Sequence, residues 1–514
     1  MFSMKIFYYV AALFLILYSI AETQALPSDF GRDTLTILLK FPQKNLDKLY
    51  PGNIAACFES HLDYWIWERG LKCNILEVEK EPKWDKMPDG SPAPFSRYIM
   101  YIEVKPKFTL VKADKSESRA KDGRQPHINL ELKIKLSLLD RSAGHLLIDH
   151  EQFQDASLPR MIADSVVPDS LQLPEPPDFV VKRIISRALG ILPRLPRDER
   201  EPAKVIPIRL MVDSHIYNDI EHGGDSAMVA ALEYASYRFN RQFGIGLKVA
   251  AKNFFTIPDV SFGDIESLFR SFSRQFPSQG DTLTVGVFRP KSPLEFYMQG
   301  QTQQIGSSEL GRRVALVAQL EMPDTSLPEW DIFLNSQLML HEIGHLLGAV
   351  HVSDIKSIMV RRTTWVGSFD FDKLNGVMIK ATLDDTPRYT GVKDYLALLT
   401  GTIDSTGYLL ADYPSIYFSY VNLNRKELAG AVFGNSPFAR SIPYAVDGYR
   451  QYLLRNSKDA FEFFRLALNG AADQGAIHYY LARVSDGKES RRELKRAAKI
   501  GYFDAVYDLI SFWK

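Results

Sequence analysis

Apolar and polar residues alternate along the first part of the chain, a pattern that is typical of half-buried strands. The clearest case is Ile128–Leu138, in which apolar residues occupy every second position. Thr34–Phe41, Arg97–Val104 and His145–Asp149 carry shorter strand patterns, and the segment Asn45–Gly70, rich in Leu, Ala and aromatic residues, predicts a helix. The pattern therefore predicts an α+β region built on an antiparallel sheet.

Two segments rich in proline and charge, Leu173–Pro177 and Pro193–Pro202, flank a predicted helix at Phe179–Leu189. Such segments are typical of connections between folded elements. We therefore place a domain boundary near residue 200 and expect residues 26–200 to form an N-terminal α+β domain. The pattern does not indicate a role for this domain.

Strand and helix patterns alternate beyond that boundary. Strands are predicted at Val205–Val212, Leu247–Phe254, Thr282–Phe288 and Val314–Leu320, and helices at Ala227–Phe243, Asp264–Phe276 and Phe333–Leu347. A mixed sheet with helices packed on it accounts for this order. We expect this second domain to occupy residues 204–385.

The chain ends in helical patterns. Apolar residues recur at three-to-four spacing in Ala460–Leu468 and Leu494–Ile500. Leu466–Ala482 and Arg496–Leu509 echo each other imperfectly and are rich in Ala and Gly. The second of them resembles a Sel1 or tetratricopeptide repeat, in which small residues let paired helices approach closely. Residues 386–514 are thus expected to be a helical, repeat-like region, with a plain helical bundle as the open alternative.

The composition fits a folded chain of several domains. Hydrophobic residues make up 46% of its 514 residues and charged residues 24%, and 62 Lys and Arg balance 62 Asp and Glu. A net charge of zero lacks the basic excess that binding to nucleic acid or to an anionic membrane requires. We therefore expect no nucleic-acid partner.

The first residues carry a targeting pattern. One lysine lies within Met1–Lys5, Ile6–Ile20 is an apolar run, and small residues follow in Ala21–Ala25. This order predicts a signal peptide over residues 1–25, cleaved after about Ala25. We expect a secreted or periplasmic protein without a membrane span after cleavage, since no later stretch is long and apolar enough.

The chain has two cysteines, Cys57 and Cys73. An exported compartment allows them to form a disulfide. Spacing alone does not decide between this pair and two buried thiols.

The segment from His341 to His351 reads His-Glu-x-x-His-x-x-Gly-x-x-His. His341 and His345 lie about one helical turn apart, so both can reach one zinc ion from the same face. Glu342 can accept a proton from water at the metal and carry it to a leaving amine. Gly348 tolerates a positive φ, so it can end the helix and turn the chain back to bring His351 to the metal.

This motif resembles that of the metzincin zinc peptidases, and a second feature supports the resemblance. Metzincins carry a methionine-containing turn beneath the metal, and Met359 in Ser357-Ile-Met359 is the matching residue. The resemblance covers about Val205–Thr382, and Phe369–Met378 looks like the acidic start of the terminal helix in matrixins, with Asp370 and Asp372 more readily capping a helix than binding calcium.

The resemblance implies a metzincin-like catalytic domain with one catalytic zinc ion. It implies that His341, His345 and His351 are the zinc ligands and that Glu342 is the general base. It also implies that Val314–Leu320 is the edge strand that holds an extended peptide by β-addition.

The sequence departs from the family pattern in three ways. Val352 stands where metzincin subfamilies carry a marker residue, and Arg361 replaces a tyrosine that some subfamilies use as an extra ligand. There is no Pro-Arg-Cys-Gly switch in the sequence. The subfamily, and whether residues 26–200 are a propeptide or a permanent domain, therefore stay open.

Together these features predict an exported zinc-dependent endopeptidase that acts on peptides or proteins. One alternative is a non-catalytic protein with a structural zinc site, which binds a partner through its helical tail and its N-terminal sheet. Glu342 argues against this alternative, because a structural zinc site does not need that carboxylate. The other alternative is a zinc amidase acting on a cell-wall peptide, which the same chemistry allows.

Overall fold

The computed structural model describes the following residues: 34–40, 54–78, 80, 97–111, 127–156, 159–161, 172–174, 177–190, 192, 195, 201–217, 224–256, 265–290, 306–309, 313–320, 329–352, 357–360, 369–384, 394–395, 398–399, 402, 441–469, 475–500, 502 and 505. The predicted signal peptide, residues 1–25, lies outside them. The described residues form helices and mixed sheets, in keeping with a multidomain α+β protein.

Contacts between residues divide the chain into two compact units. The first comprises Met1–Gln43, Trp65–Lys112 and His127–Asp198, and the second comprises Lys44–Tyr64, Ala113–Pro126 and Glu199–Lys514. Helix α2, Ile54–Glu68, begins in the second unit and ends in the first.

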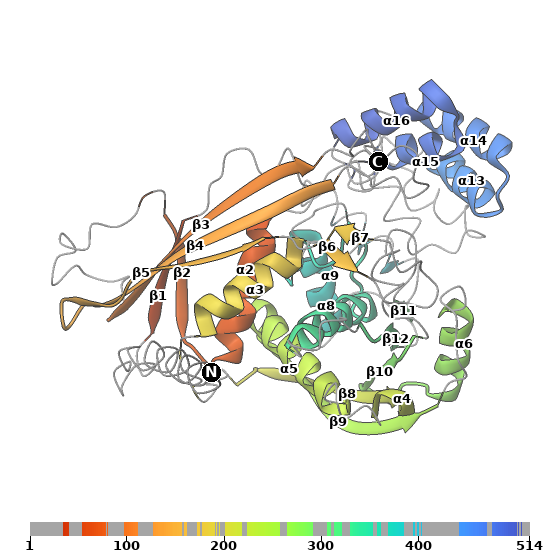
Figure 1. Cartoon of the computed structure of the whole chain (residues 1–514). Coiled ribbons are helices and arrows are strands. Elements are labelled where there is room, and N and C mark those ends of the chain that lie inside the picture. Colours follow the sequence, from red (N-terminus) through yellow and green to blue (C-terminus); the bar gives the residue numbers. More distant parts are fainter. Residues whose placement is uncertain are drawn as a thin grey trace, which may run out of the picture. The chain divides into compact units, whose positions relative to one another are not determined.

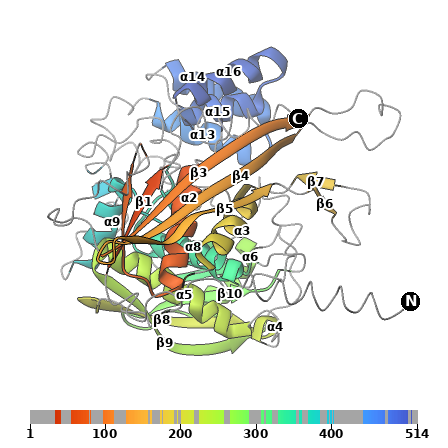
Figure 2. The same ribbon diagram turned by 60° about the vertical axis from the view of Figure 1, so that its left-hand side comes forward.

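A five-stranded sheet forms the first unit. Its strands are β1 (Leu35–Lys40), β2 (Cys73–Glu77), β3 (Tyr98–Val111), β4 (His127–Asp140) and β5 (His145–Ala156), in the order β2-β1-β3-β4-β5. Helix α3, Pro177–Gly190, packs on β4 and β5, and Arg183 donates to the carboxylate of Asp155 across that contact at 2.8 Å. Figures 1 and 2 show β3 and β4 as two long neighbouring strands. A short pair, β6 (Pro159–Met161) and β7 (Gln172–Pro174), is separate from this sheet.

The prediction that this sheet is antiparallel is wrong for one half of it. β3, β4 and β5 are antiparallel, but β1 runs parallel to both β2 and β3. For β1 and β2 the physical reason is the connection: α2 lies between them in sequence, and a helical crossover returns the chain in the same direction, as parallel pairing requires.

A second five-stranded sheet lies in the second unit. Its strands are β8 (Lys204–Asp213), β9 (Ile245–Phe255), β10 (Leu283–Phe288), β11 (Gly306–Glu309) and β12 (Val314–Ala318), in the order β11-β12-β10-β8-β9. Only β11 is antiparallel to its neighbour; the other pairs are parallel. The side chains of β10 and β12 are buried throughout, so these strands lie at the centre of the core.

The prediction that Val314–Leu320 is an edge strand is therefore wrong. β12 lies between β10 and β11, and β11 is the outermost strand on that side. The sequence Gly306–Glu309 is short and polar and gives no strand pattern, because a strand at a sheet edge needs no continuous apolar run.

The helices of the second unit pack against this sheet and against one another. Between residues 204 and 384, the described residues form the one-turn helix α4 (Ser214–Tyr217), α5 (Gly224–Phe243), α6 (Ile265–Gln275), α8 (Glu329–Leu346) and α9 (Lys373–Leu383). α5 contacts α8 and β9, α6 contacts β11 and β12, and α8 contacts β11 and β12. The zinc motif thus lies on a helix that is anchored by the sheet and by α5.

The first part of α2 contributes to the core of the second unit. The ring of His61 stacks on Phe333 of α8 with ring centroids 4.2 Å apart. Tyr64 packs edge-on against Tyr234 of α5 at 4.9 Å. All four side chains are buried. This segment therefore behaves as an integral layer of the unit that carries the zinc motif.

The described residues from 441 onward form the helices α13 (Ile442–Leu453), α14 (Ser457–Asn469), α15 (Gly475–Val484) and α16 (Gly487–Ile500). Each helix packs on the next, and α13 and α14 approach so closely that a Cβ on Gly448 would lie 2.7 Å from the ring of Phe464. The ring of His478 and the carboxylate of Glu493, both buried, lie 2.7 Å apart and join α15 to α16. The Sel1 or tetratricopeptide character of this region stays a prediction. No helix among the described residues is long and apolar enough to cross a membrane.

Candidate zinc site

His341 and His345 lie in the last turns of α8, on the same side of the helix. Apolar side chains fix this part of α8 in the core; the buried ones are Leu338, Met339, Leu340, Ile343, Leu346 and Leu347. A helix held by its apolar neighbours cannot easily rotate, so the two imidazoles have a defined direction.

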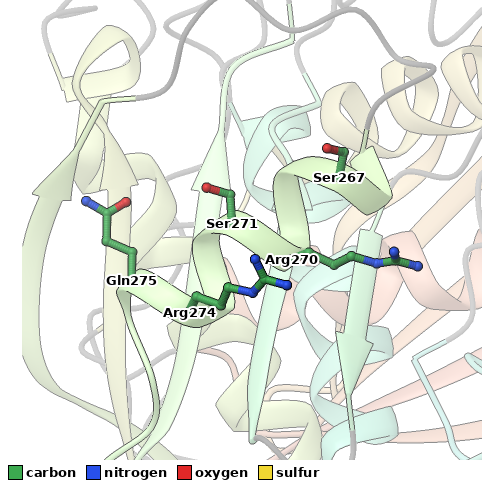
Figure 3. A pocket seen from close by; sticks show the side chains of 5 residues that line it. All are labelled: Ser267, Arg270, Ser271, Arg274 and Gln275. Carbon is green, nitrogen blue, oxygen red and sulfur yellow. The ribbon is translucent and has the colours of Figure 1, made fainter.

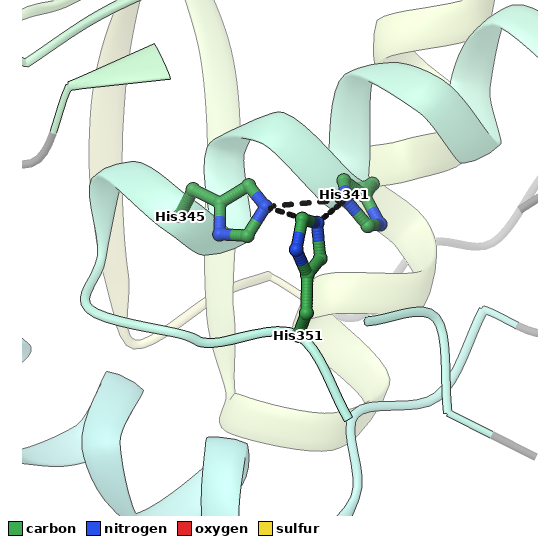
Figure 4. A group of neighbouring side chains, drawn as sticks. All are labelled: His341, His345 and His351. Atoms are coloured by element: carbon green, nitrogen blue, oxygen red, sulfur yellow. Dashed lines mark hydrogen bonds between the residues drawn. The ribbon is translucent and has the colours of Figure 1, made fainter. Parts of the chain in front are cut away.

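Gly348 ends this helix. It has φ 90°, a conformation that side chains with a Cβ rarely adopt. The amide of Gly348 donates to the carbonyl of His345 at 3.1 Å, and the amide of Ala349 donates to the carbonyl of Gly344 at 2.9 Å. These two bonds form a Schellman motif. The chain then runs back under the helix and brings His351 to the other two histidines (Figure 4).

The three rings converge on one point through their Nε2 atoms. These atoms lie 3.2 Å apart for His341 and His351, 3.2 Å for His341 and His345, and 3.1 Å for His345 and His351, as the dashed lines of Figure 4 mark. In a tetrahedral zinc site with Zn–N bonds of about 2.0–2.1 Å, ligand nitrogens lie about 3.3 Å apart. The donor set and its spacing therefore fit a zinc ion, and no other group of metal-ligating side chains of this kind occurs among the described residues.

Hydrogen bonds fix the tautomers of two of these rings. Nδ1 of His341 lies 2.7 Å from the carbonyl oxygen of Ile358, and Nδ1 of His345 lies 3.0 Å from that of Ala349. Because a carbonyl oxygen only accepts, each Nδ1 carries the proton and each Nε2 keeps a lone pair. Lone pairs that face one another at this distance repel, and a cation between them removes the repulsion.

Burial keeps these rings neutral. It lowers the pKa of His341 to about 4. Burial and the neighbouring His341 lower the pKa of His345 to about 3. Neutral imidazole is the form that binds a metal, so at neutral pH no proton needs to leave either ring first.

The methionine turn lies against the ligand helix. Met359 is fully buried, and a Cβ built on Gly344, between the two helical histidines, would lie 2.9 Å from its Sδ. The amide of Val352 donates to the carbonyl of Met359 at 3.0 Å, and Val352 and Val360 form a parallel bridge. The turn is thus tied to the segment that carries His351.

Glu342 is buried, and the edge strand β11 begins directly against it. A Cβ built on Gly306 would lie 2.2 Å from Oε1 of Glu342 and 2.6 Å from its Cδ. A side chain at this position would therefore require the carboxylate of Glu342 to shift. The sequence reasoning did not include Gly306, because a glycine in a polar segment gives no signal of its own.

Two further residues near the site were not predicted. Asn375, on α9, bonds to the main chain of Val350, the residue before His351. The hydroxyl of Tyr395 donates to the carbonyl of Gly348 at 3.0 Å and is buried. Asn375 is a polar residue in an apolar helical segment, which is the one sequence feature that could have indicated it. Tyr395 lies beyond the predicted domain end at residue 385.

The acidic residues before α9 have different roles. Asp372 is the N-cap of α9 and accepts from the amide of Asn375 at 3.0 Å, as the helix-capping interpretation expects. Burial raises the pKa of Asp372. Asp370 does not cap the helix; it accepts from Arg238 at 2.7 Å.

The cysteine prediction is not tested by the described residues. Cys73 is in β2 and partly buried, whereas the side chain of Cys57 lies outside the described part of the chain. The disulfide between them stays a prediction.

A shallow pocket lies elsewhere, on α6. Its lining residues are Ser267, Arg270, Ser271, Arg274 and Gln275 (Figure 3). All five are exposed residues of one helix. None of them is a residue of the histidine site.

Comparisons with known proteins gave matches among solved structures alone. No protein-family model and no curated protein matches the chain. The chain is similar to archaemetzincin from Methanopyrus kandleri, with 18% identity and a TM-score of 0.26 over 37% of this chain and 98% of that one. It is similar to a zinc-dependent peptidase from Methanocorpusculum labreanum, with 14% identity and a TM-score of 0.23 over 34% and 99% of the two chains.

A third similar structure is metalloproteinase-II from Bacteroides fragilis, with 13% identity and a TM-score of 0.23. That match covers 55% of this chain and 90% of the other.

Proposed function

We propose that this protein is a zinc-dependent endopeptidase whose zinc ligands are His341, His345 and His351. The observation that carries the proposal is the convergence of three Nε2 atoms within 3.1 to 3.2 Å of one another, with the Nδ1 protons of two rings held by carbonyl oxygens. Three histidines leave the fourth position of a tetrahedral ion open, as in catalytic zinc sites.

Zinc bound there would polarise the scissile carbonyl and acidify the attacking water. Glu342 follows the first ligand directly, and its carboxylate would accept the proton of the attacking water. The same carboxylate would then deliver this proton to the leaving amine, so that one residue serves as base and acid. Burial of Glu342 limits its contact with bulk water and favours this exchange.

The edge strand β11 supplies a place for an extended substrate. It pairs with β12 on one side, and its first residue, Gly306, lies against Glu342. A peptide added to β11 by main-chain hydrogen bonds would therefore pass the catalytic carboxylate. We assign to β11 the role that the resemblance to metzincins implied for Val314–Leu320.

We propose further that the protein acts outside the cytoplasm and that its tail helices bind a protein partner or substrate. The targeting pattern of residues 1–25 supports the first point. The packing of each of the helices α13 to α16 on the next, as paired helices of a binding module require, supports the second.

The proposed activity can be tested on the full mature chain. The protein is incubated with a diverse peptide library, with zinc or with a chelator, and cleavage sites are mapped by mass spectrometry. Internal cleavage in the zinc sample alone supports the endopeptidase. Zinc binding without cleavage of any peptide favours a non-catalytic zinc protein, and cleavage restricted to cell-wall peptides favours the amidase.

A further inference from the structure

Asn375 pairs with the main chain of the loop that carries His351. The amide of Val350 donates to Oδ1 of Asn375 at 2.7 Å, and Nδ2 of Asn375 donates to the carbonyl of Val350 at 3.0 Å. Asn375 is fully buried, and so is Val350. An asparagine amide has one acceptor and two donors, so this pairing satisfies both main-chain groups of the residue next to His351.

The second donor of Asn375 continues the chain of bonds. Nδ2 also donates to Oδ2 of Asp372 at 2.6 Å. The same oxygen accepts from the hydroxyl of Ser357 at 2.7 Å, and the Ser357 oxygen accepts from the amide of Met359 at 3.1 Å. Asn375, Asp372 and Ser357 therefore form one hydrogen-bonded network, which we call the α9 clamp.

Both ends of the α9 clamp lie one residue from a zinc-site contact. At one end Val350 precedes His351. At the other end Ile358 lies between Ser357 and Met359, and its carbonyl accepts from His341 Nδ1 at 2.7 Å. The clamp thus joins the loop that carries His351 to the turn whose carbonyl fixes the tautomer of His341.

Resting on the proposed zinc-binding function, we propose that Asn375 is a positioning residue for the metal, which acts through Asp372 and Ser357 to hold His351 and His341 in register. The clamp touches neither the ion nor a substrate. It restricts the conformations of the loop that carries His351 and of the turn Ser357–Met359 before zinc binds. The loss of conformational entropy on zinc binding is therefore smaller. Partners of this kind are commonly worth about 10- to 100-fold in metal affinity.

Asn335 provides a matched control. It lies on α8 and is also buried. The amide of Leu320 donates to Oδ1 of Asn335 at 2.9 Å, and Nδ2 of Asn335 donates to the carbonyl of Leu320 at 2.8 Å. Leu320 does not adjoin a histidine ligand. Asn375→Ala and Asn335→Ala therefore remove the same side chain and the same pair of main-chain bonds, and they differ in what those bonds hold.

The experiment measures zinc affinity by competition with a chelating dye, together with unfolding temperature, for the full chain and both variants. We expect Asn375→Ala to weaken zinc binding about 10- to 100-fold and Asn335→Ala to weaken it less than about threefold. The visible spectrum of the cobalt(II)-loaded protein should change for Asn375→Ala alone, because it reports ligand geometry. Equal zinc affinity in the two variants would overturn the positioning role.

A second variant covers the case in which Asn375→Ala does not fold. Ser357→Ala removes one hydroxyl from the far end of the α9 clamp and should weaken zinc binding several-fold with a smaller loss of stability. Unchanged zinc affinity in Ser357→Ala would overturn the proposed link to His341. If the wild-type protein bound no zinc, the proposed function itself would be overturned. If the wild type bound zinc and the Asn375→Ala and Asn335→Ala variants had the same zinc affinity, only the role of the α9 clamp would be overturned.

Discussion

Asp63 and Arg238 form a buried ion pair although 175 positions separate them in the sequence. Asp63 is on α2 and Arg238 on α5, and Arg241 pairs with the same carboxylate. Arg238 also bonds to Asp370, whose carbonyl accepts from the amide of Ile358 at 2.8 Å. The part of α2 that belongs to the second unit is thus tied to the turn that contacts His341. A proteolytic cut near residue 200 that released the preceding segment would remove Asp63 from this ion pair.

Replacing Asp63 should therefore destabilise the protein strongly. Asp63→Ala leaves the guanidinium of Arg238 buried without its main partner, and we expect a loss of about 3 kcal/mol in the free energy of unfolding. Denaturant unfolding measures this change. Asp281→Ala is the control, since Asp281 pairs with Arg313 at an exposed position and should cost less than about 1 kcal/mol. Similar losses in both variants would show that α2 does not matter to the core.

The same pair makes a prediction about pH. Burial alone would raise the pKa of Asp63, but the charges and hydrogen bonds of Arg238 and Arg241 outweigh it and hold that pKa below its ordinary value. The native state therefore binds fewer protons than the unfolded state, so the contribution of Asp63 is complete above the ordinary carboxyl pKa of about 4 and is lost as pH falls through the lowered value.

We expect the difference in stability between wild type and Asp63→Asn to be constant near neutral pH and to shrink as pH falls below about 5. Urea unfolding at a series of pH values measures it. If the difference in the free energy of unfolding between wild type and Asp63→Asn stayed constant at every acidic pH measured, the lowered pKa of Asp63 would be contradicted.

Met359 should support the site without binding the metal. Its side chain is fully buried against Gly344, so Met359→Leu, which is close in volume, should cost less than about 1.5 kcal/mol and leave zinc bound. Zinc content and thermal unfolding check this. Loss of zinc on this replacement would mean that the sulfur contacts the ion.

Gly306 should be needed for catalysis more than for folding. A Cβ at this position would overlap the carboxylate of Glu342, so Gly306→Ala should displace it and lower kcat by at least about tenfold while zinc stays bound. Gly376→Ala is the control, because a Cβ there meets nothing within 4 Å and the residue lies in α9. Equal kcat values for both variants would place Glu342 elsewhere during the reaction.

The end of the catalytic region can be located by truncation. Tyr395 donates to the carbonyl of Gly348, the residue that turns the chain toward His351. A chain ending at residue 440 should bind zinc and cleave short peptides, whereas a chain ending at residue 387 should bind zinc about tenfold more weakly. Zinc titration of the two proteins compares them directly. Equal affinities would show that Tyr395 lies outside the functional unit.

The sequence predicts the strands β8, β10 and β12 and the helices α5, α6 and α8 well, because these strands are largely buried apolar runs and these helices are long and rich in apolar residues. It predicts that His341 and His345 converge for a similar reason, because residues four positions apart on a helix lie on the same face. Each of these features is local, so it can be recognised without knowledge of the fold.

Features that depend on contacts between distant segments could not be predicted in this way. The short edge strand β11, which begins at Gly306, has no apolar pattern, so Val314–Leu320 was predicted to be the edge strand. The parallel direction of β1 depends on where α2 crosses the sheet. Asn375 and Asp63 look like ordinary polar positions until the fold brings Val350 and Arg238 beside them.

The most direct test of the zinc peptidase is the comparison of wild type with Glu342→Gln. The amide has the shape of the carboxylate but cannot accept the proton of water, so the variant should hold the same zinc content and lose about 10²- to 10⁴-fold in peptide cleavage. Zinc is measured by mass spectrometry of the metal, and cleavage by the rate on a peptide that the wild type cuts. A variant that keeps zinc and cleaves within a few-fold of the wild-type rate would contradict the assignment of Glu342 as the general base.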